Sequence, residues 1–128
     1  MQFSGCKIIF FDAGVYVVTS TITIPAGTHI VGEAWTTLMA KGSAFRNQYQ
    51  PQPMFRVGEV GSQGVLEITD ILFTTSGSSM FSQDVLCLIP AHVLFPHQDP
   101  GAIVVEWNVR EPDGVQAGAG MWDSHIRY

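Results

Sequence analysis

The sequence has few charged residues. Asp, Glu, Lys and Arg make up only 13% of its 128 residues, whereas a typical soluble domain has about 25%. Six of these residues are basic against eleven acidic ones, which gives a net charge of −5. The basic residues are scattered along the chain, so no patch of them could neutralise a run of phosphates. The composition therefore argues against a nucleic acid partner, and it indicates that much of the surface is covered.

Long apolar runs are also missing. No window reaches the roughly 18 to 20 consecutive apolar residues of a membrane span. Residues 1–6 lack the basic and apolar regions of a signal peptide. We therefore expect no contact with a membrane and no export signal in this chain as it is written.

Cysteine is scarce as well. Cys6 and Cys87 permit one disulfide, but their spacing marks neither a disulfide framework nor a metal site. His29, His92 and His97 are too dispersed to form a metal cluster with Cys87. We expect no metal and no cofactor, and the redox compartment stays open.

Short strands separated by Gly and Pro dominate what is present. The chain has 13 Gly and 7 Pro, which suit tight turns. Polar and apolar residues alternate over residues 19–24, as a half-buried strand requires. This pattern places Ile22 and Ile24 inward. Residues 25–27 (Pro-Ala-Gly) predict a turn, because Pro lacks an amide donor and Gly tolerates positive φ.

Further strands are expected after this turn. They cover residues 28–31, 54–58, 65–75 and 102–109, after earlier ones at 7–12 and 14–24. Leu66, Ile68 and, after a break, Leu72 are predicted to form an inward row. Residues 34–53 are interpreted as a loop that leaves the scaffold. Almost no window has helical spacing, so the pattern predicts an all-β sandwich, barrel or solenoid.

Two blocks near the start resemble a known family. Residues 6–18 (CKIIFFDAGVYVV) and 22–35 (ITIPAGTHIVGEAW) resemble the pectate-lyase-like β-helix repeat, in the version found in glycoside hydrolase family 55. Residues 61–75, 100–109 and 119–127 are similar to the same family in the same order. The resemblance covers the chain outside residues 78–99. It implies a single-stranded, right-handed parallel β-helix.

The resemblance also implies a function. Members of the family are secreted, mostly fungal exo-β-1,3-glucanases with two tandem β-helices, and residues 1–128 look like the start of the second. Inverting hydrolysis of laminarin-type β-1,3-glucan is implied, with two acid/base groups about 6.5 to 9.5 Å apart. The family's general-acid Glu lies downstream of the block at 119–127. We therefore expect that this fragment lacks it and is inactive by itself.

The chain departs from the family pattern in two places. The family's Gly-Asp-Gly-x-Thr-Asp-Asp-Thr segment, expected before Cys6, is absent. Residues 78–99 interrupt a matched block with an apolar but aperiodic stretch. We interpret this stretch as a non-family insert, arising from a translated intron or an error in the gene model.

Several residues are candidates for carbohydrate chemistry. Glu106 is the best carboxylate in the chain because it lies mid-strand beside an aromatic, but a hydrogen-bonded strand residue is the favoured interpretation. Trp35, Trp107 and Trp122 could stack on sugar rings, although a buried Trp with a satisfied indole donor is commoner. Asp123 is a candidate sugar ligand, and a turn acceptor is the favoured interpretation.

The remaining polar candidates have simpler interpretations. Glu33 is expected to accept hydrogen bonds in a turn, and Glu67 to be solvated. His125 beside Asp123 would suit a proton relay only with a nucleophile nearby, so a structural hydrogen bond is favoured. Because the fold hosts many functions, the alternative to a glucanase is a non-catalytic β-helix that binds carbohydrate or mediates adhesion.

Overall fold

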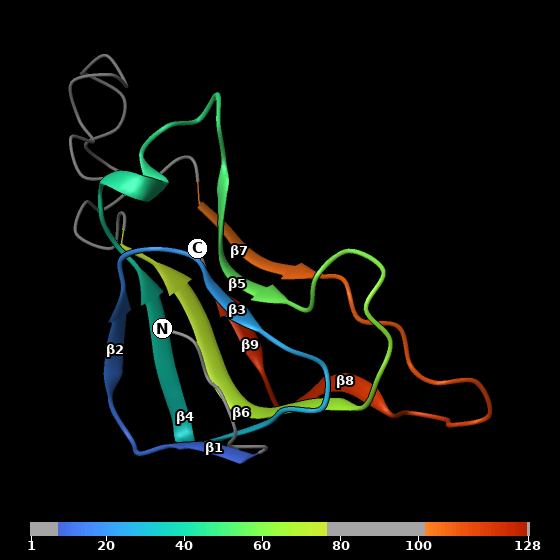
Figure 1. Ribbon diagram of the computed structural model, residues 1–128. Helices are drawn as coiled ribbons and strands as arrows, with labels where there is room; N and C mark the ends of the chain where they lie inside the picture. The colour runs from blue at the N-terminus through green and yellow to red at the C-terminus, as the bar shows by residue number, and fades with distance from the viewer. Residues whose placement is uncertain (1–7, 77–101, 128) are drawn as a thin grey trace, which may run out of the picture.

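The structure is a computed structural model that describes residues 8–76 and 102–127. Within these ranges the regular elements are nine β-strands and one 3-10 helix, η1 (Ser43–Phe45). The strands form two sheets, here called A and B, and every strand pairing is parallel (Figure 1). The all-β prediction is therefore confirmed. Predictions for Cys6, Cys87, His92, His97 and the insert at 78–99 lie outside the described residues.

Sheet A is built from two long strands flanked by pairs of short ones. It contains β1 (Ile8–Phe11), β2 (Val15–Val18), β4 (His29–Ala40), β6 (Leu66–Thr75), β8 (Ala119–Trp122) and β9 (His125–Arg127). β1 and β2 pair with the two halves of β4, and β8 and β9 pair with the two halves of β6. β4 and β6 pair with each other. The chain therefore passes through sheet A four times in the same direction, as β1 with β2, β4, β6, and β8 with β9. Each of these four passes is called a crossing.

Sheet B consists of β3 (Ile22–Ile24), β5 (Gln52–Val57) and β7 (Ala102–Trp107), in that order. Each of its strands follows one crossing of sheet A: β3 follows β2, β5 follows β4 and β7 follows β6. Figure 1 shows the two sheets facing each other across the interior. No helix in the described part of the chain is long and apolar enough to cross a membrane.

The core lies between the two sheets and is built from stacked columns of apolar side chains. In sheet A, Ile30 stacks on Ile68, and Leu38 stacks on Phe73. These four residues are fully buried. Phe73 also meets Phe55 of sheet B, with ring centroids 5.4 Å apart. In a parallel stack, equivalent positions of successive strands face the same side, so each column stays inside along its length.

One prediction from the sequence was wrong about residues 34–53. Residues 34–40 continue β4, because Thr36, Leu38 and Ala40 alternate inward and pair with β6. The alternation was hidden by Ala34 and Trp35, which adopt left-handed φ angles of 50° and 59°. Irregular chain therefore begins only after Ala40, and it contains η1 before β5 starts.

The predicted inward row of β6 was half right. Leu66 and Ile68 are buried, but Leu72 lies on the other face, while Ile71 and Phe73 point inward. The cause is Asp70, whose φ of 57° shifts the alternation by one residue. The predicted strand 14–24 is likewise divided into β2 and β3. The turn at residues 25–27 is confirmed, with Gly27 at φ 89°.

Candidate functional site

The bends of β4, β6 and the β8–β9 segment lie side by side at one corner of sheet A. The register pairs Val31 with Thr69 before the bend, and Leu72 with His125 after it. Trp35, Asp70 and Asp123 occupy the bends with φ angles of 59°, 57° and 48°. Asp tolerates the left-handed region better than most residues. Residues from three separate blocks of sequence therefore form one corner.

Trp35 and His125 meet at this corner. Their ring centroids are 5.3 Å apart and the rings are nearly perpendicular, at 85°. The Trp35 side chain is still 55% exposed. His125 therefore packs against an aromatic ring, and Trp35 keeps much of its surface in solvent.

Trp122 lies on the outer face of sheet A, next to the corner. A Cβ added at Gly120 would come within 3.0 to 3.4 Å of three atoms of its six-membered ring. The face of the indole therefore lies over Gly120, and this glycine leaves room for it. Trp122 is 39% exposed. The ring therefore packs on backbone while part of it stays in solvent, and stacking on a sugar ring needs such an exposed aromatic.

His29 and Glu67 form a pair on the same outer face of sheet A. Gly120, beneath the Trp122 ring, is paired in the sheet with Glu67, and Glu67 with His29. Nδ1 of His29 lies 3.0 Å from Oε2 of Glu67, and both side chains are partly exposed. Sequence reasoning missed this pair because its members are 38 residues apart. Only their outward positions in two predicted strands could have hinted at it.

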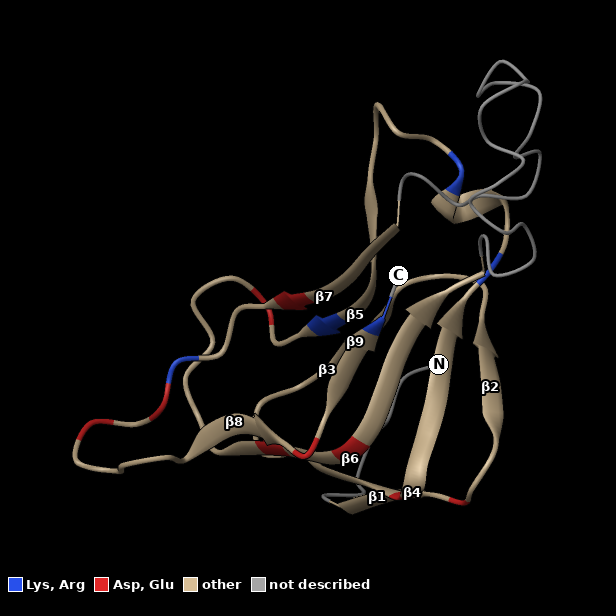
Figure 2. Ribbon diagram, turned by 180° about the vertical axis from the view of Figure 1, so that it is seen from behind, with Lys and Arg blue, Asp and Glu red and all other residues tan. Residues whose placement is uncertain are grey.

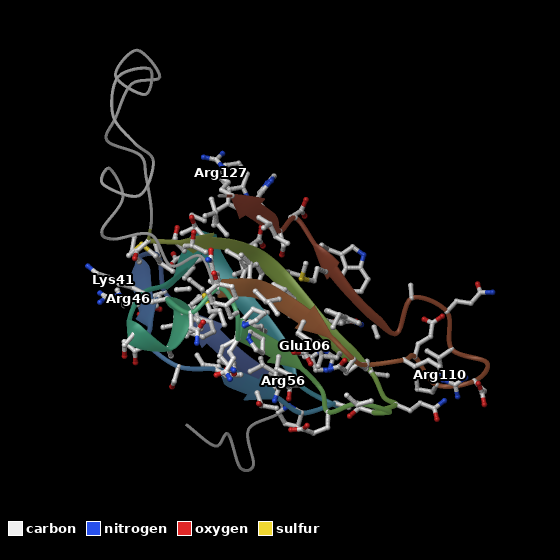
Figure 3. The ribbon with its side chains drawn as sticks, turned by 90° about the horizontal axis from the view of Figure 1, so that it is seen from above. Lys41, Arg46, Arg56, Glu106, Arg110 and Arg127 are labelled. Carbon is white, nitrogen blue, oxygen red and sulfur yellow. The ribbon has the colours of Figure 1, made fainter. Side chains whose placement is uncertain are left out.

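Glu106 lies apart from this corner, on sheet B. Its Oε1 accepts hydrogen bonds from Nδ2 of Asn108 at 2.7 Å and from Nε of Arg56 at 3.2 Å. Figure 2 shows the basic segment of β5 beside the acidic segment of β7, and Figure 3 shows both side chains. The pKa of Glu106 is lowered, chiefly by the hydrogen bond from Asn108. Burial acts in the opposite direction, and the charge of Arg56 and its hydrogen bond add to the lowering.

The chemistry of Glu106 follows from these partners. A general acid in glycoside hydrolysis needs a raised pKa so that it still carries its proton near neutral pH. The lowered pKa of Glu106 instead keeps the carboxylate ionised and engaged with two donors. This geometry suits a carboxylate that joins β5 to β7. A catalytic role for Glu106 stays a prediction.

Trp107, also on β7, differs from the other two tryptophans. Its Nε1 donates a hydrogen bond to the carbonyl of Val109 at 2.8 Å. It stacks in register with Val57, which is buried, and packs against the core. Its indole donor is thus satisfied within the protein, whereas Trp35 and Trp122 are exposed.

The candidate residues therefore divide into two groups. Trp35, Trp122 and Asp123 gather on sheet A together with His125, and we call these four residues the aromatic corner. Glu106 and Trp107 lie on sheet B. Oε2 of Glu33 accepts a hydrogen bond from the backbone N–H of Ala13, at 3.4 Å.

No protein-family model matches the sequence. Curated fungal proteins do match it. A protein of Arthroderma benhamiae named a probable glucan endo-1,3-β-glucosidase is 40% identical over 121 residues, which are 94% of this chain and 11% of the relative. A glucan 1,3-β-glucosidase of Cochliobolus carbonum is 34% identical, again over 94% of this chain, and 12% of its own length is covered.

A third relative has a different kind of name. A protein of Penicillium expansum named a non-secreted LysM effector is 40% identical over 94% of this chain. The match covers 7% of that protein. The chain is thus homologous to short segments of proteins named glucan 1,3-β-glucosidases and of a protein named an effector. It spans about a tenth of the length of these curated relatives.

Proposed function

We propose that this chain is a segment of a β-1,3-glucan hydrolase. The observation that carries the proposal is the 34 to 40% identity to proteins named glucan 1,3-β-glucosidases over 94% of the chain. The enzyme proposed is a secreted, inverting, exo-acting hydrolase of laminarin-type glucan, of glycoside hydrolase family 55. This segment supplies scaffold, and the aromatic corner supplies a contact surface for glucan.

The proposed architecture is a right-handed, single-stranded parallel β-helix. Its support is the repeated order of the strands: each crossing of sheet A stacks on the one before, and three crossings are followed by a strand of sheet B. Stacked coils of this kind bury a continuous core. The buried column that contains Leu38 and Phe73 is part of such a core.

Glucan binding by the aromatic corner can be tested by co-sedimentation with insoluble β-1,3-glucan. We expect the 128-residue protein to bind weakly, and Trp122→Ala and Trp35→Ala to reduce the bound fraction, because each removes an exposed stacking ring. Tyr49→Ala is the matched control, since Tyr49 is a highly exposed aromatic of the loop before β5. An equal loss in all three variants would reject the corner as the binding surface.

Hydrolysis is tested separately. We propose that the 128-residue protein is inactive, in keeping with the lowered pKa of Glu106. Release of glucose from laminarin by the purified protein, abolished by Glu106→Gln, would overturn this. For a longer product of the same gene, glucose as the first product indicates exo action. Proton NMR of that product distinguishes inversion, which gives the α-anomer first, from retention.

A non-catalytic, carbohydrate-binding or adhesive β-helix is the second candidate, and the relative named a LysM effector favours it. Binding to glucan would then persist in a longer gene product that releases no sugar. Comparing glucan binding with sugar release for that longer product separates the two candidates.

A further inference from the structure

A row of side chains crosses the outer face of sheet A from β4 to β8. His29, Glu67 and Gly120 are paired in register on neighbouring strands, and the ring of Trp122 covers Gly120. Neighbouring strands lie about 4.8 Å apart, so the row extends over about 10 Å. It places an imidazole, a carboxylate and an indole next to one another on one face.

The pair formed by His29 and Glu67 lies in the middle of the sheet. β4 and β6 each have paired strands on both sides, so the outward exposure of the pair does not depend on an edge of sheet A. The His29 side chain is 36% exposed and that of Glu67 is 45% exposed. Leu66 and Ile68, on either side of Glu67 in β6, are buried. The alternation of a strand with one face in the core therefore directs the carboxylate outward.

Hydrogen bonding holds one oxygen of Glu67 and leaves the other available. Nδ1 of His29 lies 3.0 Å from Oε2 of Glu67. An ionised carboxylate can only accept, so Nδ1 is the donor in this pair. Oε1 accepts no hydrogen bond from the described residues. It can therefore accept one from the hydroxyl of a ligand, and a hydrogen bond to a charged acceptor is stronger than one between neutral groups.

We propose that Glu67 binds a glucose unit by accepting a hydrogen bond from one of its hydroxyls, while Trp122 stacks on the same sugar ring and His29 positions the carboxylate. This inference rests on the proposed function, because the ligand is a β-1,3-glucan. It adds two residues that the aromatic corner does not contain.

Glucose has the shape that this row requires. In the β-anomer all its ring hydroxyls and its CH₂OH group are equatorial, so they surround the rim of the ring and leave two C–H faces. A C–H face can pack on the indole of Trp122. The hydroxyls then point sideways, toward the neighbouring strand that carries Glu67. An aromatic platform with a polar group placed beside it is the usual composition of a small-molecule site.

The test is an NMR titration of the ¹⁵N-labelled 128-residue protein with laminarihexaose, a soluble hexamer of β-1,3-linked glucose. We expect the indole N–H signal of Trp122, assigned with Trp122→Ala, to shift as the sugar binds. Glu67→Gln should weaken binding about threefold to tenfold, because a neutral amide oxygen is a poorer acceptor than a carboxylate. Glu59→Gln is the matched control. It removes the same charge from an exposed position in the loop after β5, and it should leave the Kd unchanged.

Two substitutions at His29 separate positioning of Glu67 from a merely structural role. His29→Asn places an amide N–H near the position of Nδ1, so it should keep the hydrogen bond to Glu67 and bind laminarihexaose like the wild type. His29→Ala removes the donor and should weaken binding about twofold to fivefold. The amide spectrum of each variant shows whether it folds. Equal binding by His29→Ala and the wild type would overturn the positioning role.

The outcomes distinguish this inference from the proposed function. If Trp122→Ala loses binding while Glu67→Gln binds like the wild type, the aromatic corner still binds glucan and the role of Glu67 is overturned. Equal weakening in Glu67→Gln and Glu59→Gln would indicate a general effect of charge, and it would overturn that role too. A wild-type protein whose signals do not shift with laminarihexaose would overturn both this inference and glucan binding by the aromatic corner.

Discussion

Nε of Arg56 lies 3.2 Å from Oε1 of Glu106, at directly paired positions of β5 and β7. The two residues are 50 positions apart in sequence, and Asn108 donates a second hydrogen bond to the same oxygen. This arrangement ties the last strand of sheet B to its neighbour by a carboxylate that is ionised in the folded protein.

The pH dependence of folding should reflect this carboxylate. The hydrogen bond from Asn108 and the charge of Arg56 lower the pKa of Glu106 below its ordinary 4.5. Since the folded pKa is the lower one, the stabilisation is present above pH 4.5 and is lost as the pH falls through the folded pKa. We expect Glu106→Gln to lower the melting temperature at neutral pH and to differ less from wild type in strong acid.

Thermal denaturation monitored by circular dichroism from neutral pH downward measures this difference. Asp113→Asn is the control, because Asp113 forms a highly exposed pair with Arg110 at 3.6 Å. Exposed pairs contribute little to stability. If Glu106→Gln and wild type melt in parallel at every pH, the pairing does not stabilise the fold.

Thr36 is a buried polar residue that joins the first two crossings of sheet A. Its Oγ1 lies 2.9 Å from the carbonyl oxygen of Asp12 and also accepts a hydrogen bond from the N–H of Glu33 at 3.2 Å. Thr36→Val keeps the shape but leaves these backbone groups without a partner. We expect a loss of about 1 to 3 kcal/mol in the free energy of unfolding.

Urea denaturation of Thr36→Val measures this loss. The control is Thr37→Val, because Thr37 is the next residue of β4, is only partly buried, and has no described side-chain hydrogen bond. Equal stabilities for the two variants would mean that the Thr36 hydroxyl does not hold the bend.

Gly32 is required by close contact between two crossings. A Cβ at this position would lie 2.4 Å from the carbonyl oxygen of Asp70 and 2.7 Å from Cδ1 of Ile71. Gly32→Ala should therefore displace the bend of β6 and destabilise the protein by about 1 to 3 kcal/mol or more. Gly14→Ala is the control, since its nearest neighbour would be 3.9 Å away. Comparable melting temperatures for both variants would contradict the close approach.

Phe73 connects the two sheets. It is fully buried and its ring packs against Phe55 of sheet B. Phe73→Ala should cost about 3 to 5 kcal/mol of stability, because it removes a large side chain and leaves a cavity. Tyr49→Ala, at a highly exposed aromatic, should change stability little. Chemical denaturation of both proteins at low concentration tests the contrast; a small effect of Phe73→Ala would show that the core collapses around the gap.

The sequence by itself predicted the all-β class and most strands, because alternation between two faces is a local property. It predicted the turn at residues 25–27, where Pro and Gly restrict the backbone directly. It failed at Ala34, Trp35 and Asp70, because non-glycine residues in the left-handed region have no strong local signature. Ala34 and Trp35 interrupt the alternation, so β4 was cut short, and Asp70 shifts it by one residue, so Leu72 was placed on the wrong face.

The composition of the candidate site was decided by tertiary structure. The sequence identified Trp35, Trp122 and Asp123 separately, and register alone brought Trp35 onto His125 and the Trp122 ring over Gly120 beside Glu67. It also offered Glu106 as an acid, whereas its partners Arg56 and Asn108 lower its pKa. Local patterns specify which face a side chain occupies, but its neighbours across a parallel sheet are tens of residues away. Only the stacking of the strands determines them.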